Sequence, residues 1–452
     1  MNRLAPVFVV TLAFAVAVLA SPAEALPRMG LQAGSRCVNC HVNPQGSGLR
    51  SDLGWYSMNQ IGAFTWDKLG LDGMHNIESN TWMDGKVLFG FDDRIQVAKL
   101  RPPVYNRKTG TVTEPERVIF PMQFTPGLAF FPMPTLTLSL TANVPGLLAS
   151  YKEGLTEEEK AKAEWTKNFR RYPGQSGYEA WALWQGEFTW PSVKVGVMQP
   201  SFGIRHDDHT MLLRRDARNL AQPTLPPYYA DPGLEVSWTK DFEGETLSSH
   251  LTLDAGVFMA RNYAEFEVRT DTAKYLLLLN EKTSESDVKD AAKGTPIVTG
   301  RATWFPQMLE HGLNGTVQAS IFQAGDLAMH DVAIGIGKGY WGTLIAEYVH
   351  GMAPKRTISN WMVQLAYPAF DWLVAEARYE RATTNDQHDD GTLKDWTATS
   401  AVVGVQFFPV PFLELRPEYR YMVASDAAAE DPAADLWHYT MAQWTFQAHL
   451  FF

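Results

Sequence analysis

The sequence predicts an all-β protein: a 16-stranded antiparallel transmembrane β-barrel that follows a short N-terminal segment. Three observations support this fold class. Apolar and polar residues alternate from Gly85 onward, short and long turns follow one another, and the chain ends on a strand that closes with Phe452. Alternation with a period of two residues is typical of strands, because successive side chains point to opposite faces of the sheet.

The first residues have the pattern of a signal peptide. Arg3 precedes an apolar run from Val7 to Ala20, and the sequence SPAEA that follows is typical of a signal-peptidase site. The run is shorter than the ~20 apolar residues that a membrane-spanning helix needs. We therefore expect cleavage after Ala25 and export. The predicted organisation is a signal peptide at 1–25, an N-terminal segment at 26–83 and a barrel at 84–452.

The barrel prediction depends on strands and turns together. In FLELRPEYRYMV (412–423), Leu413 and Leu415 fall on one face while Glu414, Arg416 and Glu418 fall on the other. Short turns are predicted at FFPMPT, TWPSV, DFEGE, WFPQMLEHG, GKGYW, AYPAFDW and FFPVPF. The other connections, at about 101–117, 146–177, 203–227, 263–294, 383–394 and 424–435, are more often long and polar. This alternation predicts sixteen strands, from about 86–100 to about 436–452. Both termini would then be periplasmic and the long loops extracellular.

The end of the chain favours insertion into outer-membrane lipid over the alternative of a periplasmic all-β protein. In WHYTMAQWTFQAHLFF, Trp444, Phe446 and Phe452 share one face. A last strand that ends on phenylalanine resembles the assembly signal of outer-membrane barrels. Tryptophans near strand ends fit interfacial girdles: Trp190, Trp304, Trp341, Trp372, Trp396 and Trp437. We also expect a short helix at 157–170. The net charge of −11 and the lack of a basic stripe argue against nucleic acid as a partner.

One motif carries chemistry. Cys37 and Cys40 are the only cysteines in the chain, and His41 follows them directly. Cys-x-x-Cys-His is the attachment site of one covalent c-type haem, with two thioether bonds and the histidine as an axial ligand of the iron. Coincidence would produce this pattern about once in ten thousand such chains. A zinc site would need two distant histidines, and a thioredoxin-like dithiol would need a flanking strand and helix.

The second axial ligand is open from the sequence. Met58, Met74, His75 and Met83 all precede the barrel, and a thioether or an imidazole would give an iron suited to electron transfer. We favour Met58, which lies in a predicted short helix, and a five-coordinate iron is the remaining alternative. A segment this small needs a staple, and we expect a core in which the haem packs against Trp55, Tyr56, Phe64 and Trp66.

A second cluster, from Arg205 to Arg218, contains His206, Asp207, Asp208 and His209 beside Arg214 and Arg215. We interpret it as a polar loop folded into the barrel mouth, as in porins. A substrate or ion filter built from the arginines and a metal site built from the histidines and aspartates are the alternatives.

The signal peptide, the CVNCH motif and the sixteen strands together resemble the fused monohaem cytochrome-porins of the bacterial outer membrane, with the layout found in iron oxidisers. The resemblance covers the whole chain in layout, and CVNCH is its specific part. It implies a cytochrome c-like segment in or against the barrel lumen. That segment would pass electrons between an extracellular donor or acceptor, such as ferrous iron, and periplasmic carriers. Cys37, Cys40 and His41 carry over by residue.

This resemblance makes an electron-transfer protein the leading interpretation, with iron oxidation as the one enzymatic activity it includes. The alternative is a solute or ion porin whose haem segment is a plug or a sensor. A haem peroxidase would need an open site with a general base, and nothing in residues 42–83 requires one.

Overall fold

The computed structural model describes residues 27–46, 48–75, 79–99, 104–106, 111–113, 117–144, 177–186, 190–204, 211–217, 219–223, 225, 229–261, 295–353, 356–387, 393–426 and 438–451. The predicted signal peptide and the predicted helix at 157–170 lie outside these residues.

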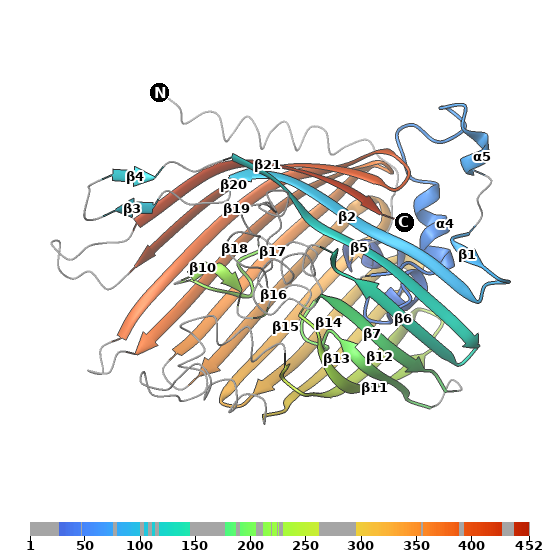
Figure 1. The fold of residues 1–452 in the computed structure, drawn as a ribbon, viewed down its shortest axis with the longest axis horizontal. Coiled ribbons are helices and arrows are strands. Elements are labelled where there is room, and N and C mark those ends of the chain that lie inside the picture. Colours follow the sequence, from blue (N-terminus) through green and yellow to red (C-terminus); the bar gives the residue numbers. More distant parts are fainter. Residues whose placement is uncertain are drawn as a thin grey trace, which may run out of the picture.

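The described strands form one closed antiparallel barrel (Figure 1). Its sheet has 17 strands, of which the two-residue β1 (Thr81–Trp82) pairs only with the start of β2, so sixteen strands make the wall. They are β2 (Val87–Lys99), β5 (Arg117–Met133), β6 (Leu136–Ala142), β7 (Tyr178–Trp184), β8 (Ser192–Met198), β11 (Asp231–Phe242), β12 (Leu247–Phe258), β13 (Ile297–Met308), β14 (Leu313–Ala324), β15 (Leu327–Lys338), β16 (Gly342–Ala353), β17 (Arg356–Phe370), β18 (Leu373–Gln387), β19 (Leu393–Val410), β20 (Leu413–Asp426) and β21 (His438–Phe451). The predicted 16-stranded barrel is confirmed.

The barrel closes where its first and last strands pair. β2 lies antiparallel to β21, with Asp92 opposite Phe451 and Arg94 opposite His449. On its other side β2 pairs with β5, and each later strand pairs with the next around the wall. Closure leaves no sheet edge, which a membrane-spanning sheet requires because lipid offers no hydrogen bonds to an open backbone.

The alternation in the sequence separates the two faces of the wall. On β15, Val332, Ile334 and Ile336 point outward with 51, 55 and 46% of their surface exposed, whereas Asp331 and Ala333 point inward and are 1% exposed. On β21, Trp444 is outward and 72% exposed, while Gln447 and His449 are buried inside. An apolar outer face and a polar inner face are the pattern of a transmembrane barrel. Among the described residues, no helix is long and apolar enough to cross a membrane.

The two rims of the barrel differ as the turns predict. All seven predicted short turns occur at one rim; two of them contain 3-10 helices, η2 (Leu309–His311) and η3 (Gly339–Trp341). Phe451 and the segment that leads into β2 lie at this same rim (Figure 1). The connections at the opposite rim include the β3 (Val104–Asn106) and β4 (Thr111–Thr113) hairpin, although two of them, 325–326 and 354–355, have only two residues.

The connection from β8 to β11 folds inward and fills part of the lumen. Ser201 Oγ donates to Glu235 Oε2 at 2.6 Å, and the backbone N–H of Leu212 donates to Glu380 Oε1 at 3.2 Å, so the connection binds walls on β11 and β18. Within it, β9 (Arg215–Asp216) pairs with β10 (Asn219–Pro223). Its apolar side chains pack on the inner wall in one core: Phe202, Met211, Leu213, Leu225 and Tyr229. A polar inward loop was expected, and its contacts with the wall are both polar and apolar.

In the described residues before the barrel there are four helices: α2 (Pro27–Ala33), α3 (Cys37–Cys40), α4 (Asp52–Asn59) and α5 (Asp72–His75). α2 contacts β14, β15 and β16 on their inner face, whereas α4 and α5 lie at the short-turn rim (Figure 1). The first part of the N-terminal segment therefore lies inside the barrel.

Candidate functional site

α2 is fixed against a gap in the inner wall. Leu31, which is 2% exposed, lies over Gly335 and Gly337 of β15, where a Cβ atom would come within 2.7 and 2.8 Å of the leucine. Two wall amides donate to the backbone at the end of the helix: Asn314 Nδ2 to Leu31 O at 2.7 Å and Gln307 Nε2 to Gly34 O at 2.6 Å. The missing side chains on β15 make the room that the leucine occupies.

The Cys-x-x-Cys-His motif follows as one helical turn. Cys37 and Cys40 begin and end α3, and the N–H of His41 donates to Cys37 O at 2.9 Å. His41 then leaves the helix in an extended conformation and pairs with Arg50 in an antiparallel bridge. The chain returns to the motif because the N–H of Ser51 donates to Cys40 O at 3.0 Å. The thiols and the imidazole are thus held on one compact loop.

A buried ion pair on the wall seats that loop. Lys194 Nζ lies 3.0 Å from Glu235 Oε1, with the side chains 4 and 1% exposed. Gln45 bridges them: its Oε1 accepts from Lys194 at 3.1 Å and its Nε2 donates to Glu235. A buried pair of this kind is satisfied only while its hydrogen-bonding partners stay in place. The loop that follows His41 therefore completes a polar cluster of the barrel.

α4 closes the other side of the motif. Ser51 Oγ caps the helix by accepting from the N–H of Gly54 at 3.3 Å. Met58 and Trp55, 1 and 5% exposed, pack with three phenylalanines of the barrel, Phe408, Phe412 and Phe451. The rings of Trp55 and Phe412 lie 5.1 Å apart. α4 thus buries one face against the end of β19 and β21.

The four aromatic residues expected around the haem differ in exposure. Trp55 is buried and Trp66 packs against the same cluster, whereas Tyr56 and Phe64 are 52 and 54% exposed. For Phe64 the reason is a contact of its backbone with the barrel. The N–H of Phe64 donates to Pro409 O at 2.9 Å, so the backbone is fixed on the turn between β19 and β20 while the ring points away.

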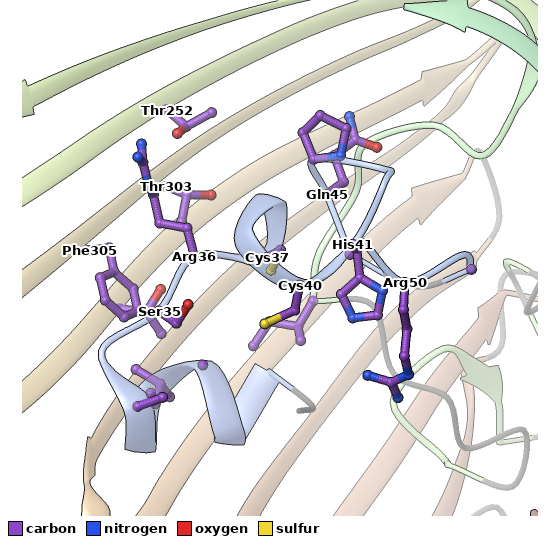
Figure 2. A pocket seen from close by; sticks show the side chains of 18 of the residues that line it. Ser35, Arg36, Cys37, Cys40, His41, Gln45, Arg50, Thr252, Thr303 and Phe305 are labelled. Carbon is purple, nitrogen blue, oxygen red and sulfur yellow. The ribbon is translucent and has the colours of Figure 1, made fainter. Parts of the chain in front are cut away.

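Cys37, Cys40, His41 and Met58 line one cavity of about 410 Å³ between the N-terminal segment and the inner wall (Figure 2). Cys37 is exposed and Cys40 half-buried. The volume lies in the usual range of ligand pockets, about 300–1,000 Å³. Of the other candidate axial ligands, Met74 and Met83 are 42 and 70% exposed. His75 ends α5, and its side chain lies outside the described part of the chain.

The cavity walls carry ion pairs that the sequence did not single out. On one side Arg301 Nη2 lies 2.8 Å from Asp254 Oδ2. On the other, His449 lies between two carboxylates: its Nε2 is 3.0 Å from Asp92 Oδ1 and its Nδ1 is 3.0 Å from Glu414 Oε2. The inward phase of each strand was visible in the alternation, but which inward residues face the motif depends on how the barrel is closed.

These residues fit a covalently attached haem. The two thiols are on one turn, the imidazole follows them, and Met58, Phe408 and Phe451 give the cavity an apolar wall. Charged side chains also line the cavity, among them Arg50 and Arg94. Residues 37, 40 and 41 would hold the group, and Met58 is the candidate that the structure brings to the same cavity.

The Arg205–Arg218 cluster is described only in part. Residues 205–210 and 218 lie outside the described residues, so a metal site at His206 to His209 stays an expectation. Arg214 Nη2 donates to Phe202 O at 2.9 Å and to Ile204 O at 2.7 Å, and Arg215 Nε donates to Met211 O at 3.0 Å. Both arginines therefore brace their own loop. Within the described residues, no group of three or more His, Cys, Asp or Glu side chains is arranged to hold a metal ion.

No protein-family model matches this chain, and no curated protein matches its sequence. Among solved structures, the outer-membrane channel DcaP of Acinetobacter baumannii aligns over 82% of this chain and 99% of its own, with 12% identity and a TM-score of 0.46. OprB of Pseudomonas putida aligns over 82 and 95%, with 13% identity and a TM-score of 0.46. OmpF of Salmonella typhi, in complex with daunomycin, aligns over 82 and 99%, with 11% identity and a TM-score of 0.45.

The strand pairing and the two faces of the wall define the class of protein. A closed sixteen-strand antiparallel barrel, apolar outside and polar inside, is a porin-type β-barrel of the outer membrane.

Proposed function

We propose that the protein is an outer-membrane electron conduit. One covalent haem c would be joined to Cys37 and Cys40 with His41 as an axial ligand. Electrons would pass between an extracellular donor or acceptor, ferrous iron being one candidate, and periplasmic carriers. The observation that carries the proposal is that the only two cysteines of the chain and the adjacent histidine line one cavity within a closed barrel. The bound group would supply one-electron exchange at its iron.

The protein's own residues would position that group. α3 presents the two thiols on one turn, and the bridge between His41 and Arg50 holds the imidazole in an extended backbone beside them. Met58, buried on α4, is our candidate for the second axial ligand. The seat on β15 and the cluster of Gln45, Lys194 and Glu235 keep the loop inside the wall.

We infer the orientation of the barrel from its class. Short turns face the periplasm and long loops face the outside in outer-membrane barrels. α4, α5 and the C-terminal end of β21 lie at the short-turn rim (Figure 1). In this orientation both termini of the barrel chain would be periplasmic, and the N-terminal segment that carries the motif would face the periplasmic carriers.

The test compares wild-type protein with Cys37→Ala and His41→Ala in proteoliposomes that contain an encapsulated redox dye. We expect covalent haem by intact mass in the wild type, and electron flow from an external donor that both variants lose. His250→Gln is the matched control, because His250 lines the same cavity outside the motif and bonds Asp241 at 2.7 Å. Unchanged electron flow in Cys37→Ala would refute the conduit.

A second candidate is a solute or ion porin whose N-terminal segment is a plug or a sensor. The barrel itself favours it: sixteen strands with a polar inner wall are the architecture of porins, which conduct through a water-filled lumen. The two candidates differ in a measurement on haem-loaded protein in planar bilayers. Steady ion conductance without electron transfer supports the porin, and electron transfer across a non-conducting barrel supports the conduit.

A further inference from the structure

Arg50 lines the cavity on the far side of His41 from the thiol of Cys40 (Figure 2). Arg50 lies opposite His41 in the antiparallel bridge. Side chains of directly opposed residues project to the same face, with Cβ atoms about 4.5–5.5 Å apart. Figure 2 shows the imidazole of His41 between the thiol of Cys40 on one side and the guanidinium of Arg50 on the other. All three residues line the one cavity.

The barrel supports this side of the cavity with the last residues of the chain. The guanidinium carbon of Arg50 lies 4.6 Å from the centre of the Phe451 ring, and that ring lies 4.5 Å from the ring of His449. A guanidinium that stacks on an aromatic face is held in place. Its N–H donors lie in the plane of the guanidinium, so they point past the ring and not into it. Phe451 therefore positions the arginine against the cavity.

The nearby carboxylates are engaged by other cations. Asp92 accepts from Arg94, with Nε at 3.1 Å and Nη2 at 3.2 Å, and lies 3.0 Å from His449. Glu414 lies 3.0 Å from the other nitrogen of the same imidazole. His449 thus joins Asp92 to Glu414, and Arg94 also binds Asp92. Arg50 lines the same cavity as these four residues.

We propose that Arg50 binds a carboxylate of the haem, so that this side of the cavity is the site for the propionate edge of the porphyrin. The inference rests on the proposed function. A haem joined through its vinyl groups has both propionates on another edge of the ring, and Cys40 and Arg50 flank His41 as those two edges would require. A carboxylate that is removed from water is costly unless it is paired, and the guanidinium fork is the matching partner.

The role has an electrostatic consequence that a merely structural arginine would not have. A cation near the iron favours the reduced state, which has one positive charge less. Removal of the cation, with the propionate left unpaired, favours the oxidised state. The equilibrium constant for reduction should therefore fall by about three- to tenfold, and tenfold corresponds to about 59 mV for a one-electron couple. An unpaired propionate also takes up a proton more readily, so the midpoint potential should become dependent on pH.

The test is potentiometry of haem-loaded Arg50→Gln, Arg50→Lys and wild-type protein between pH 5 and pH 8. We expect a lower, pH-dependent potential in Arg50→Gln and a nearly wild-type potential in Arg50→Lys, which keeps the charge. Arg36→Gln is the matched control, because Arg36 lines the same cavity but directs its guanidinium to Asp241 at 3.4 Å. We expect Arg36→Gln to match the wild type.

Two outcomes distinguish a failure of this inference from a failure of the proposed function on which it rests. If wild-type protein carries no covalent haem by intact mass, the proposed function fails. If it carries haem but Arg50→Gln and Arg36→Gln change the potential equally, or neither changes it, the site for the propionate edge is refuted. If Arg50→Gln does not fold, Phe451→Leu replaces it: loss of the aromatic platform should shift the potential in the same direction, and an unchanged potential contradicts the role of Arg50.

Discussion

The seat of Leu31 gives a prediction whose size follows from the structure. Leu31 is 2% exposed and fills the space that Gly335 and Gly337 leave in the inner wall. Leu31→Ala removes three carbon atoms from this contact and leaves a cavity, which costs about 2–5 kcal/mol at buried sites. Because the contact exists only while α2 is seated, the full cost falls on the seated state. The unseated fraction should rise by at least about 30-fold, since 1.4 kcal/mol is a factor of ten.

Single-channel conductance of haem-loaded protein in planar bilayers measures that fraction. We expect openings in Leu31→Ala that are rare in the wild type, together with faster proteolysis of the N-terminal segment. Leu53→Ala is the matched control, because Leu53 lies on α4 and is 54% exposed. It should leave both measurements unchanged.

A double-mutant cycle with Gly335→Ala isolates the contact itself. A Cβ atom on Gly335 would lie 2.7 Å from Leu31 Cδ1 and 2.8 Å from Thr316 Cγ2. Leu31→Ala removes the first clash and leaves the second, so the second cancels from the cycle. Gly335→Ala should therefore cost less in the Leu31→Ala background than in the wild type. Equal costs in the two backgrounds, with unchanged conductance, would refute the seat of α2 on β15.

Three further predictions concern the residues around the motif. Met58→Leu keeps the packing of α4 but removes the thioether. It should therefore convert a six-coordinate haem spectrum to a five-coordinate or newly ligated one. Met74→Leu, at a 42% exposed position, should leave the spectrum unchanged. Lys194→Met leaves Glu235 buried beside Gln45 without its cation and should lower the free energy of unfolding by about 3–5 kcal/mol in detergent; Lys194→Met with Glu235→Leu should recover part of the loss. Arg214→Met removes two hydrogen bonds to the carbonyls of Phe202 and Ile204, so the free energy that holds the inward loop in place should fall by at least about 2 kcal/mol. Proteolysis between β8 and β11 should then be faster. A cleavage rate equal to that of the wild type would contradict the bracing role.

The barrel was predictable from the sequence because its signals are local. Each strand carries its own alternation, and each short turn its own proline or glycine. The stretch WFPQMLEHG illustrates this: the structure has η2 at Leu309–His311, and Gly312 follows with a left-handed φ of 58°. The first strand, expected at about 86–100, is observed at Val87–Lys99. Neither inference needed to know which strand lies beside which.

The surroundings of the motif were not predictable for the complementary reason. Cys37, Cys40 and His41 are adjacent in sequence, so their pattern is visible at once. The partners of their loop are far along the chain: Gln45 reaches Glu235, and Leu31 reaches Gly335. These contacts depend on closure, tilt and strand register together, and a one-residue slip in register would turn the inward face outward.

Charge pattern alone does not reveal the role of a charged residue. Arg214 and Arg215 have the composition of an ion filter, and in the fold their guanidinium groups donate to the carbonyls of Phe202, Ile204 and Met211. A sequence does not distinguish an arginine that faces a pore from one that holds its own loop. Tyr56 and Phe64 show the same limit for apolar residues, because their exposure depends on which face of the segment the barrel covers.

The position of the cavity at the closing seam ties the two parts of the molecule together. Its wall includes Asp92 of β2, Glu414 of β20 and His449 of β21, and the imidazole joins the two carboxylates across the pairing of the first and last strands. The wall therefore exists only after the barrel has closed, whereas the motif itself is complete within five residues. Any chemistry at Cys37 and Cys40 that precedes closure can depend only on the motif, and the environment that sets the properties of the site depends on the barrel.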